Sequence, residues 1–534
     1  MSAQTIRELA RRRLGFERLR PGQLRAVAAA ADGRDVLAVL PTGGGKSAIY
    51  ELAGLLRAQP TVVVSPLIAL QDDQLAHLRA AGLSAIVLNS QQSVGARAAA
   101  LLSSCEPDAF VFVAPEQLTN PQTREALRRA RPGLFVVDEA HLISQWGHDF
   151  RTDYMRLGAQ ADALEAPVRL ALTATAAPPV RQEICRRLGL RDPEVVIGNF
   201  DRPHIELSVH HVRSAEEKRR EIERSASEFP GSGIVYAATH AGAQAAEDAL
   251  ASAGHQVTLY HAGLSPRARR EAMNAFLDGS ARIVAATVAF GMGIDKRDVR
   301  WVLHADPPAS LDAYYQELGR AGRDEEAAHA RLLYRPEDFA MARHLTARGV
   351  PGGVVARVAD RLASTPREIA VDQLAASLGL GPRPLTAALV RLVDLGAAAW
   401  QADGQLRWSG TLSVPTALRA SEAETEREAE VERSRLEMMR RYAEHTGCRR
   451  SFLLSYFGQN YPGPCGKCDN DGARAPRAQA VEPFAVGGRV ASDRWGEGTV
   501  QRYDGDQLTV LFDDHGYRDL LLPLVLERRL LRPV

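Results

Sequence analysis

The chain has 534 residues, of which 45% are hydrophobic and 25% charged, and its formal net charge is +1. At ordinary domain sizes this length makes about three to five domains. A near-neutral charge means that any nucleic-acid surface must be local. No apolar run in the sequence reaches the ~18 residues that span a bilayer, and the first residues lack the apolar core of a signal peptide. We therefore expect a cytoplasmic protein with no membrane partner.

Short apolar runs alternate with helical stretches over residues 1–202 and again, after a break at 198–203, over residues 203–345. This alternation predicts an α/β fold with two parallel-sheet lobes, each covered by helices on both faces. The strands expected in the first lobe are Val36–Leu40, Thr61–Ser65, Ala85–Leu88, Ala109–Ala114, Leu134–Val137 and Arg169–Thr173. Those expected in the second are Gly233–Tyr236, Gln256–Tyr260, Arg282–Ala286, Arg300–His304 and Ala330–Tyr334.

A glycine-rich loop, Leu40-Pro-Thr-Gly-Gly-Gly-Lys-Ser47, follows the first expected strand. Loops of this kind hold phosphates with backbone N–H groups, and the lysine contacts the β- and γ-phosphates. We expect Lys46 and Ser47 to bind the phosphates and Mg²⁺. The strict pattern has glycine where this chain has Leu40, but the rest of the loop is intact. The expected phosphate cradle consists of Thr42, Gly43, Gly44 and Gly45.

Two adjacent acids, Asp138 and Glu139, follow the strand at 134–137. An acid at a strand end holds the Mg²⁺ that bridges the phosphates, so Asp138 is the expected ligand. Glu139 is expected to polarise the attacking water, and His141 to couple the two lobes. Together with the loop, these acids predict hydrolysis of a nucleoside triphosphate.

Positive charge for the transition state is expected from Arg320 and Arg323 in the second lobe. Their spacing of three predicts that both lie on one face of a helix. Gly319 and Gly322 would then stand near its start, where glycine is costly unless another group approaches closely. Because these arginines belong to a separate lobe, the nucleotide is expected to lie between the lobes.

Residues 346–412 contain two short helical patterns, separated at 379–384, and then two short strands around an Asp-Gly turn. Helix, turn, helix and hairpin in this order predict a winged-helix-like unit. Its arginines, Arg383, Arg391 and Arg407, could contact DNA phosphates, and a role in packing or protein contact is equally open.

Residues 413–472 begin with a charged helix expected over 421–445, with Ser421 as its cap. Cys448, Cys465 and Cys468 follow it, and in a reducing compartment such a cluster indicates a metal before a disulfide. The remaining cysteines, Cys105 and Cys185, are expected in the core.

Residues 473–484 are expected to be a linker, and 485–534 a small β-barrel. This last unit resembles the SH3/Tudor-like barrels of some superfamily 1 repair helicases, which contact protein partners, RNA polymerase included, or nucleic acid. Its aspartates favour a protein partner, and these are Asp504, Asp506, Asp513 and Asp514.

Several motifs together resemble those of the RecQ family of superfamily 2 DNA helicases. Residues 14–23 are similar to its adenine-reading motif, which implies that Phe16 stacks on the base and that Arg20 and Gln23 hydrogen-bond to it. The resemblance also implies a nucleotide contact for Gln316. Segments 65–70, 114–118 and 171–176 look like motifs Ia, Ib and III, and 260–264 and 289–296 look like IVa and V. Ser65 and Thr173 are the implied DNA contacts in this group.

Residues 141–151 are similar to the aromatic-rich loop of that family. Trp146 and Phe150 can stack on bases of single-stranded DNA, and Arg151 can meet a phosphate. The alternative is that the two rings are ordinary core aromatics.

The cysteine cluster is similar to the zinc module of the same family, which uses four cysteines. Here Asp471 stands at the fourth position, and Cys₃Asp can bind zinc, although a carboxylate is a harder and weaker ligand than a thiolate. Bound Zn²⁺ and a metal-free remnant both stay open. The winged-helix-like unit precedes this module, whereas in the commoner family layout it follows.

The resemblance implies a 3′-to-5′ helicase, dependent on ATP and Mg²⁺, that acts on single-stranded and tailed duplex DNA in repair, recombination or replication. The alternative is a DNA- or RNA-stimulated ATPase that remodels nucleic acid, or a polymerase-associated complex, without separating strands. A non-catalytic scaffold is disfavoured because Lys46, Asp138, Glu139, Arg320 and Arg323 are all present.

Overall fold

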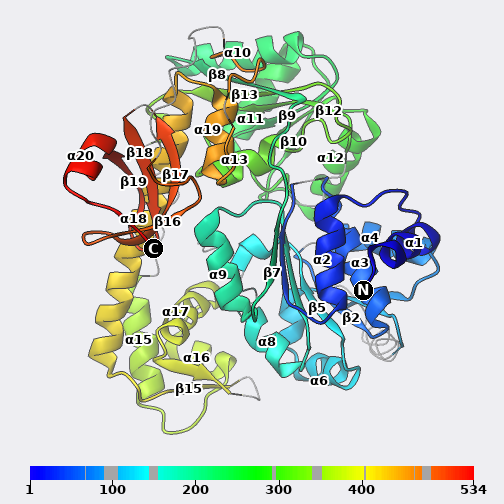
Figure 1. Cartoon of the computed structure of the whole chain (residues 1–534), viewed down its shortest axis with the longest axis vertical. Coiled ribbons are helices and arrows are strands. Elements are labelled where there is room, and N and C mark those ends of the chain that lie inside the picture. The colour runs from blue at the N-terminus through cyan, green and yellow to red at the C-terminus, as the bar shows by residue number, and fades with distance from the viewer. Residues whose placement is uncertain are drawn as a thin grey trace.

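The computed structural model of the chain contains two α/β lobes, one above the other in Figure 1, with the later elements along one side of both. It describes residues 1–41, 43–66, 68–88, 106–143, 154, 156–291, 296–339, 351–401, 405–461, 463–471, 483–504 and 506–534. Among these residues, no helix combines the length and the apolar character that crossing a bilayer requires.

The first lobe is built on a parallel sheet of seven strands in the order β3-β4-β2-β5-β6-β1-β7. The strands are β1 (Val36–Val39), β2 (Thr61–Val64), β3 (Ala85–Leu88), β4 (Phe110–Val113), β5 (Leu134–Val137), β6 (Arg169–Thr173) and β7 (Glu194–Ile197). Six of them were predicted. The edge strand β7 was not: its apolar run, Val195–Ile197, is only three residues long, and Val195 and Ile197 are exposed.

Helices cover both faces of this sheet, and two apolar cores fill the space between the layers. The helices are α1 (Ala3–Leu14), α2 (Pro21–Ala31), α3 (Lys46–Arg57), α4 (Ile68–Ala80), α6 (Pro121–Arg129), α8 (Leu157–Ala163) and α9 (Pro178–Leu188), with short 3₁₀ turns at Pro115–Thr119 and Ala140–Ile143. Strands buried on both faces match the continuous apolar runs seen in the sequence.

The second lobe has a parallel sheet of six strands in the order β10-β11-β9-β12-β13-β8. They are β8 (Ile205–His211), β9 (Ser232–Tyr236), β10 (Val257–Tyr260), β11 (Ile283–Ala286), β12 (Val299–His304) and β13 (Ala328–Tyr334), and the helices are α10 (Ala215–Glu228), α11 (His240–Ser252), α12 (Pro266–Asp278) and α13 (Leu311–Leu318). The two parallel-sheet lobes are confirmed. Strand β8 was missed because only its alternate residues are buried.

The next unit contains three helices, α15 (Gly352–Ala363), α16 (Val371–Leu378) and α17 (Pro382–Asp394), and a hairpin of β14 (Ala398–Trp400) and β15 (Leu406–Trp408). The prediction of two helices was wrong. The chain breaks between α15 and α16, where Ile369 forms an isolated bridge with Leu406 of the hairpin. This unit lies against the first lobe: the Arg156 guanidinium is 3.6 Å from the Trp400 ring centre.

Helix α18 (Val414–Glu444) is 31 residues long and runs from the three-helix unit to the second lobe (Figure 1). Its predicted start was wrong. Ser413 is the cap, accepting a hydrogen bond from the Thr416 N–H, and Ser421 is buried inside the helix. The helix starts early because its first turns bury Ala417 in the core shared with α15.

The C-terminal part is an antiparallel sheet in the order β19-β18-β17-β16-β20, joined to α18 through the short helix α19 (Arg449–Tyr456). Its elements are β16 (Arg489–Ser492), β17 (Gly496–Asp504), β18 (Gln507–Phe512), β19 (Gly516–Leu521), α20 (Leu522–Glu527) and β20 (Arg532–Pro533). The sheet lies against α18 and α19 (Figure 1), and Leu511 and Tyr517 join the large core of the two lobes.

Candidate active site and metal centre

The glycine-rich loop leads from β1 directly into the N-terminus of α3, whose first residue is Lys46. Gly43 and Gly45 have φ values of 77° and 71°, in the left-handed region that favours glycine. A Cβ on Gly44 would stand 2.7 Å from the Pro41 carbonyl oxygen. The loop therefore needs its glycines, and it presents the open N–H groups of a helix start, which suit a phosphate. Thr42 lies outside the described residues.

Gln23 of α2 hydrogen-bonds to the backbone of this loop and so stabilises it. Its Nε2 donates to the carbonyl oxygens of Gly44 (3.0 Å) and Gly45 (2.9 Å), and its Oε1 accepts from the Arg20 N–H (2.8 Å). The Phe16 ring stacks on the His77 ring, with 5.9 Å between centres. Of the three residues expected to read adenine, Gln23 is therefore bonded to the loop, and Arg20 is bonded to Gln23 through its N–H.

The acid pair stands at the end of β5. Asp138 is buried, and Glu139 follows at a φ of 51°, which turns its side chain away from the strand direction. Glu139 Oε2 is 3.3 Å from His141 Nδ1, which is 2.9 Å from the Thr173 hydroxyl. These contacts of His141 stay within the first lobe, so His141 fixes the orientation of Glu139 against the end of β6. Its expected role in coupling the lobes stays a prediction.

The electrostatics of the pair separate its two carboxyls. Burial, and then the Glu139 carboxylate, raise the pKa of Asp138 against the opposing effect of Lys46. Burial also acts on Glu139, but Lys46, His141 and Arg320 lower the pKa of Glu139 overall. Glu139 is thus held as a carboxylate that can accept a proton or orient a water. A cation bound beside Asp138 would favour its charged form and so oppose the effect of burial on its pKa.

Arg320 and Arg323 lie in the turn that follows α13, which ends at Leu318. The prediction that they share a helix face was wrong, because Gly322 adopts a φ of 60° and ends the helical path. A Cβ on Gly322 would stand 2.6 Å from His204 Cδ2. Arg320 is 7% exposed, and its field acts on Glu139 of the other lobe. The structure therefore brings Lys46, Asp138, Glu139 and Arg320 into one electrostatic group across the two lobes.

The remaining predicted residues have other surroundings. Gln316 lies in the last turn of α13 and is partly exposed. Ser65 and Thr173, the expected DNA contacts, are fully buried, and the Thr173 hydroxyl bonds to His141 and to the Thr175 carbonyl. The predicted DNA loop residues Trp146, Phe150 and Arg151 lie outside the described residues.

Two arginines that join the parts of the molecule were not foreseen. Arg181 of α9 donates to the Phe457 carbonyl (2.9 Å) after α19, and Arg202 lies 3.5 Å from the carbonyl oxygens of Gly319 and Ala321 in the arginine turn. Arg391 was offered as a DNA contact, but it is buried and paired with Glu428 of α18. No local motif marks these three residues, since their partners are far away in the sequence.

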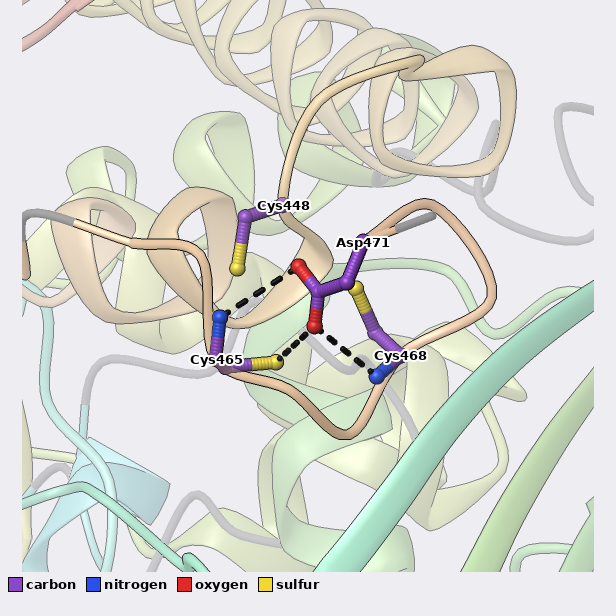
Figure 2. Close-up of side chains that lie close together, drawn as sticks. All are labelled: Cys448, Cys465, Cys468 and Asp471. Carbon is purple, nitrogen blue, oxygen red and sulfur yellow. Dashed lines mark hydrogen bonds between the residues drawn. The ribbon is translucent and has the colours of Figure 1, made fainter. Parts of the chain in front are cut away.

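Figure 2 shows Cys448, Cys465, Cys468 and Asp471 pointing toward one another, and their ligand atoms all lie within 4.8 Å of each other. The Asp471 carboxylate accepts from the N–H groups of Cys465 (3.3 Å), Lys467 (3.0 Å) and Cys468 (3.2 Å) and lies 3.0 Å from Cys465 Sγ. Four such donors around one point suit a tetrahedral ion, so the cluster fits Zn²⁺.

This cluster is tied to the second lobe by a strand-like contact. The Leu207 N–H of β8 donates to the Lys467 carbonyl (3.1 Å), and the Asp469 N–H donates back to Leu207 (3.2 Å). The Asp469 carboxylate accepts from the Val209 N–H (2.9 Å). A metal here would hold α18, α19 and β8 together, which is a structural role.

Glu51, one turn after Lys46 in α3, gives a prediction for stability. It is buried, its Oε2 has no hydrogen-bond partner among the described residues, and burial raises its pKa to about 7. Burial favours the neutral carboxyl, so the folded protein holds this proton more tightly than the unfolded chain does. The contribution of Glu51 to the free energy of unfolding is therefore fully present below about pH 4.5 and is lost as the pH rises through about 7. Glu51→Gln should therefore raise the free energy of unfolding by about 3 kcal/mol at pH 8 and by little at pH 5.

Urea unfolding of both proteins at the two pH values measures this difference. The exposed Glu337→Gln is the matched control and should change neither value. A Glu51→Gln effect that is equal at pH 5 and pH 8 would contradict the assignment.

Comparison with known families gives three matches along the chain. Residues 20–184 match the DEAD/DEAH box helicase family, residues 216–325 match the helicase conserved C-terminal domain, and residues 414–471 match the RecQ zinc-binding family. These matches fall on the first lobe, the second lobe, and the helical segment that ends in the metal cluster.

Relatives with similar sequences include proteins named ATP-dependent DNA helicase RecQ. The one from Haemophilus influenzae is 32% identical over 463 residues, which cover 85% of this chain and 61% of the relative. Those from Pasteurella multocida and Bacillus subtilis are 37% and 38% identical, over 63% and 62% of this chain and 53% and 56% of their own lengths. The chain thus spans a little over half the length of these curated relatives.

Solved structures share the fold at lower sequence identity. The DUF1998 helicase MrfA bound to DNA superimposes with a TM-score of 0.54 at 17% identity, covering 77% of this chain and 63% of that one. Mycobacterium smegmatis helicase Lhr bound to ssDNA and AMP-PNP gives 0.52 at 21% identity, covering 79% and 61%. These likenesses establish the two-lobed architecture.

Proposed function

The chain belongs to the RecQ family of superfamily 2 helicases, and from that premise we propose that it is an ATP-dependent DNA helicase that moves 3′ to 5′ along one strand and unwinds duplex DNA. The observation that carries this proposal is the composite site. Lys46 and the acid pair belong to one lobe, and Arg320, which acts on Glu139, belongs to the other. A site divided in this way lets hydrolysis drive relative movement of the lobes.

In this proposal the loop from Thr42 to Gly45, with Lys46, holds the triphosphate, and Phe16, Arg20, Gln23 and Gln316 contact the rest of the nucleotide. Ser47 and Asp138 offer the hard oxygen ligands that suit Mg²⁺, which would neutralise charge on the β- and γ-phosphates. Glu139 orients and polarises the attacking water. Arg320 and Arg323 stabilise the charge that develops on the transferred phosphoryl group.

DNA contacts complete the proposal. Trp146, Phe150 and Arg151 would bind single-stranded DNA by stacking and by a phosphate contact, with Ser65 and Thr173 as further proposed contacts. The two solved helicases named above are described as bound to DNA and to ssDNA, which supports a nucleic-acid partner for this fold. We infer zinc at the Cys₃Asp cluster from its donor set and from the RecQ zinc-binding match.

We also propose the following units: lobes at 1–202 and 203–345, a winged-helix-like unit at 346–412, the helical metal module at 413–472, a linker at 473–484 and a small barrel at 485–534. The winged-helix-like unit is supported by its helices and hairpin. The barrel is supported by its antiparallel sheet. We infer that the protein acts in the cytoplasm.

A protein partner at the C-terminal unit is supported by exposed apolar side chains. Five of the ten large hydrophobic side chains that are exposed among the described residues lie in the last fourteen residues, and they are Leu521, Leu524, Leu526, Leu530 and Val534. The aspartates of the C-terminal unit, which the sequence suggested as a reason for a protein partner, are weaker support. Asp513 pairs with Arg489, and Asp514 pairs with Arg427 of α18.

Strand displacement on 3′-tailed, 5′-tailed and forked duplexes tests the proposed function. We expect ATP-dependent unwinding of the 3′-tailed and forked substrates, none of the 5′-tailed one, and none with Lys46→Ala. Strong DNA-stimulated ATP hydrolysis without unwinding would instead support the second candidate, a remodelling ATPase. The burial of Arg391 in an ion pair favours that candidate, because it removes one DNA contact from the winged-helix-like unit.

A further inference from the structure

The C-terminal sheet is fixed to α18 by close packing and by several ion pairs. A Cβ on Gly516, at the start of β19, would stand 3.3 Å from the Val431 Cα of α18. Ion pairs join Arg427 to Asp514, Arg518 to Glu430 and Arg441 to Asp519. The sheet is thus part of the same packed body as the helical module, although the RecQ zinc-binding match ends at residue 471.

One aromatic pair continues this contact toward the second lobe. The Tyr517 ring of β19 stacks on the Tyr456 ring of α19, with 5.4 Å between centres and 25° between planes. Both rings are buried. The Tyr456 hydroxyl donates a hydrogen bond to the Asp312 carboxylate, which belongs to the first turn of α13.

Asp312 is where several elements meet. Arg435 of α18 is within its electrostatic reach, as is Arg181 of α9 in the first lobe. Further along α13, the rings of Tyr314 and Tyr315 pack on Tyr442 (5.1 Å) and Phe457 (4.8 Å). The helical module therefore contacts α13 at three positions between Asp312 and Tyr315.

The other end of α13 carries the arginine turn. Asp312 and Leu318 are separated by about 9 Å of helix at ~1.5 Å per residue, and Gly319 and Arg320 follow immediately. A packed helix of this length moves as a rigid body, because close-packed interiors transmit displacement. A shift at Asp312 therefore changes where the Arg320 guanidinium stands relative to Glu139.

We propose that the C-terminal sheet positions the arginine turn: Tyr517, through the Tyr456 ring and its hydrogen bond to Asp312, holds α13 so that Arg320 faces the carboxylates of the first lobe. This inference rests on the proposed function, because it gives Arg320 a part in ATP hydrolysis. Tyr517, Tyr456 and Asp312 are positioning residues, and none of them touches the nucleotide.

The test uses the full chain with Tyr456→Phe, which removes only the hydroxyl, and Tyr517→Ala, which removes the stacked ring. Tyr503→Phe is the matched control: its hydroxyl bonds to the Phe484 carbonyl (2.8 Å) inside the C-terminal unit, away from α13. Arg320→Ala reports on the proposed function itself. Steady-state ATP hydrolysis with saturating single-stranded DNA gives kcat and KM for each variant, and thermal unfolding verifies that each is folded.

We expect kcat to fall about tenfold in Tyr456→Phe and Tyr517→Ala, with KM for ATP within about twofold of the parent, because misplacing a catalytic group costs turnover more than binding. Tyr503→Phe should match the parent. A second readout is the gain in affinity when aluminium fluoride is added to ADP, which mimics the transition state. That gain should shrink about tenfold in the two variants, whereas binding of ADP alone stays unchanged.

The outcomes are separable. If Arg320→Ala is inactive but Tyr456→Phe keeps the parent's kcat and aluminium-fluoride gain, the positioning inference is wrong and the proposed function stands. If Arg320→Ala is fully active, the arginine turn is not part of the site, and the composite site that carries the proposed function is wrong together with this inference. If Tyr517→Ala fails to fold, Tyr456→Phe alone decides the inference.

Discussion

Arg320→Ala should lower DNA-stimulated ATP turnover by about 10³-fold and leave nucleotide binding within about twofold. Arg320 reaches the site from the second lobe, and its charge already lowers the pKa of Glu139. It is needed where charge develops on the transferred phosphoryl group, and less where the ground-state nucleotide binds. Steady-state hydrolysis together with binding of a fluorescent nucleotide separates the two effects.

Arg267→Ala is the matched control for this variant, because it removes an arginine of the second lobe whose side chain is 83% exposed. It should be indistinguishable from the parent. Arg320→Lys keeps the charge but loses the planar fork of donors, so it should restore only part of the activity. Full turnover by Arg320→Ala would show that the arginine turn is not part of the site.

Cys468→Ser should abolish zinc binding and lower the midpoint of thermal unfolding by about 10 °C or more. A structural zinc site contributes several kcal/mol to folding. In a folding unit of about 150–250 residues, each kcal/mol of stability lost lowers the midpoint of thermal unfolding by about 2–4 °C. The loss should be large here because the cluster joins α18 and α19 to β8 through the Leu207–Lys467 contact. Zinc content by elemental analysis and thermal unfolding of the same sample measure both effects.

Asp471 gives the finer comparison at that site. Asp471→Cys should slow the release of zinc to a chelator, because thiolate is the softer and stronger ligand, and Asp471→Ala should speed it. Cys185→Ser, a half-buried cysteine of α9 outside the cluster, is the control and should retain one zinc. If the parent protein holds no zinc and Cys468→Ser unfolds at the same temperature as the parent, the site is a metal-free remnant.

The sequence was most informative where chemistry is local. Lys46 and Asp138 could be predicted because the loop that ends in Lys46 and the acid pair each come after a buried strand, and the ends of parallel strands meet at one edge of a sheet. The Cys₃Asp cluster could be assigned because three of its four ligands lie within seven residues. The two parallel-sheet lobes could be predicted because short apolar strands alternate with helical stretches along residues 1–345.

Local patterns were weaker at the ends of elements. The Arg320–Arg323 spacing fits a helix, yet the left-handed Gly322 turns the chain beside His204. Ser421 precedes an acidic run as a cap does, yet packing against α15 extends the helix back to Ser413. In both cases tertiary contact overrides a local preference.

Contacts between distant segments could not be foreseen at all. Nothing near Tyr517 in the sequence indicates Tyr456, and nothing near Tyr456 indicates Asp312. The docking of the C-terminal sheet therefore had to come from the structure, and it changes the expected picture of a separate barrel that only carries partners.

The most direct measurement of the central claim is the rate of ATP hydrolysis by the full chain with and without a single-stranded oligonucleotide. Polynucleotide that closes the two lobes should bring the second-lobe guanidinium onto the scissile phosphate, so we predict at least about tenfold faster turnover when it is present, lost in Lys46→Ala. Equal rates in its presence and absence would contradict the account.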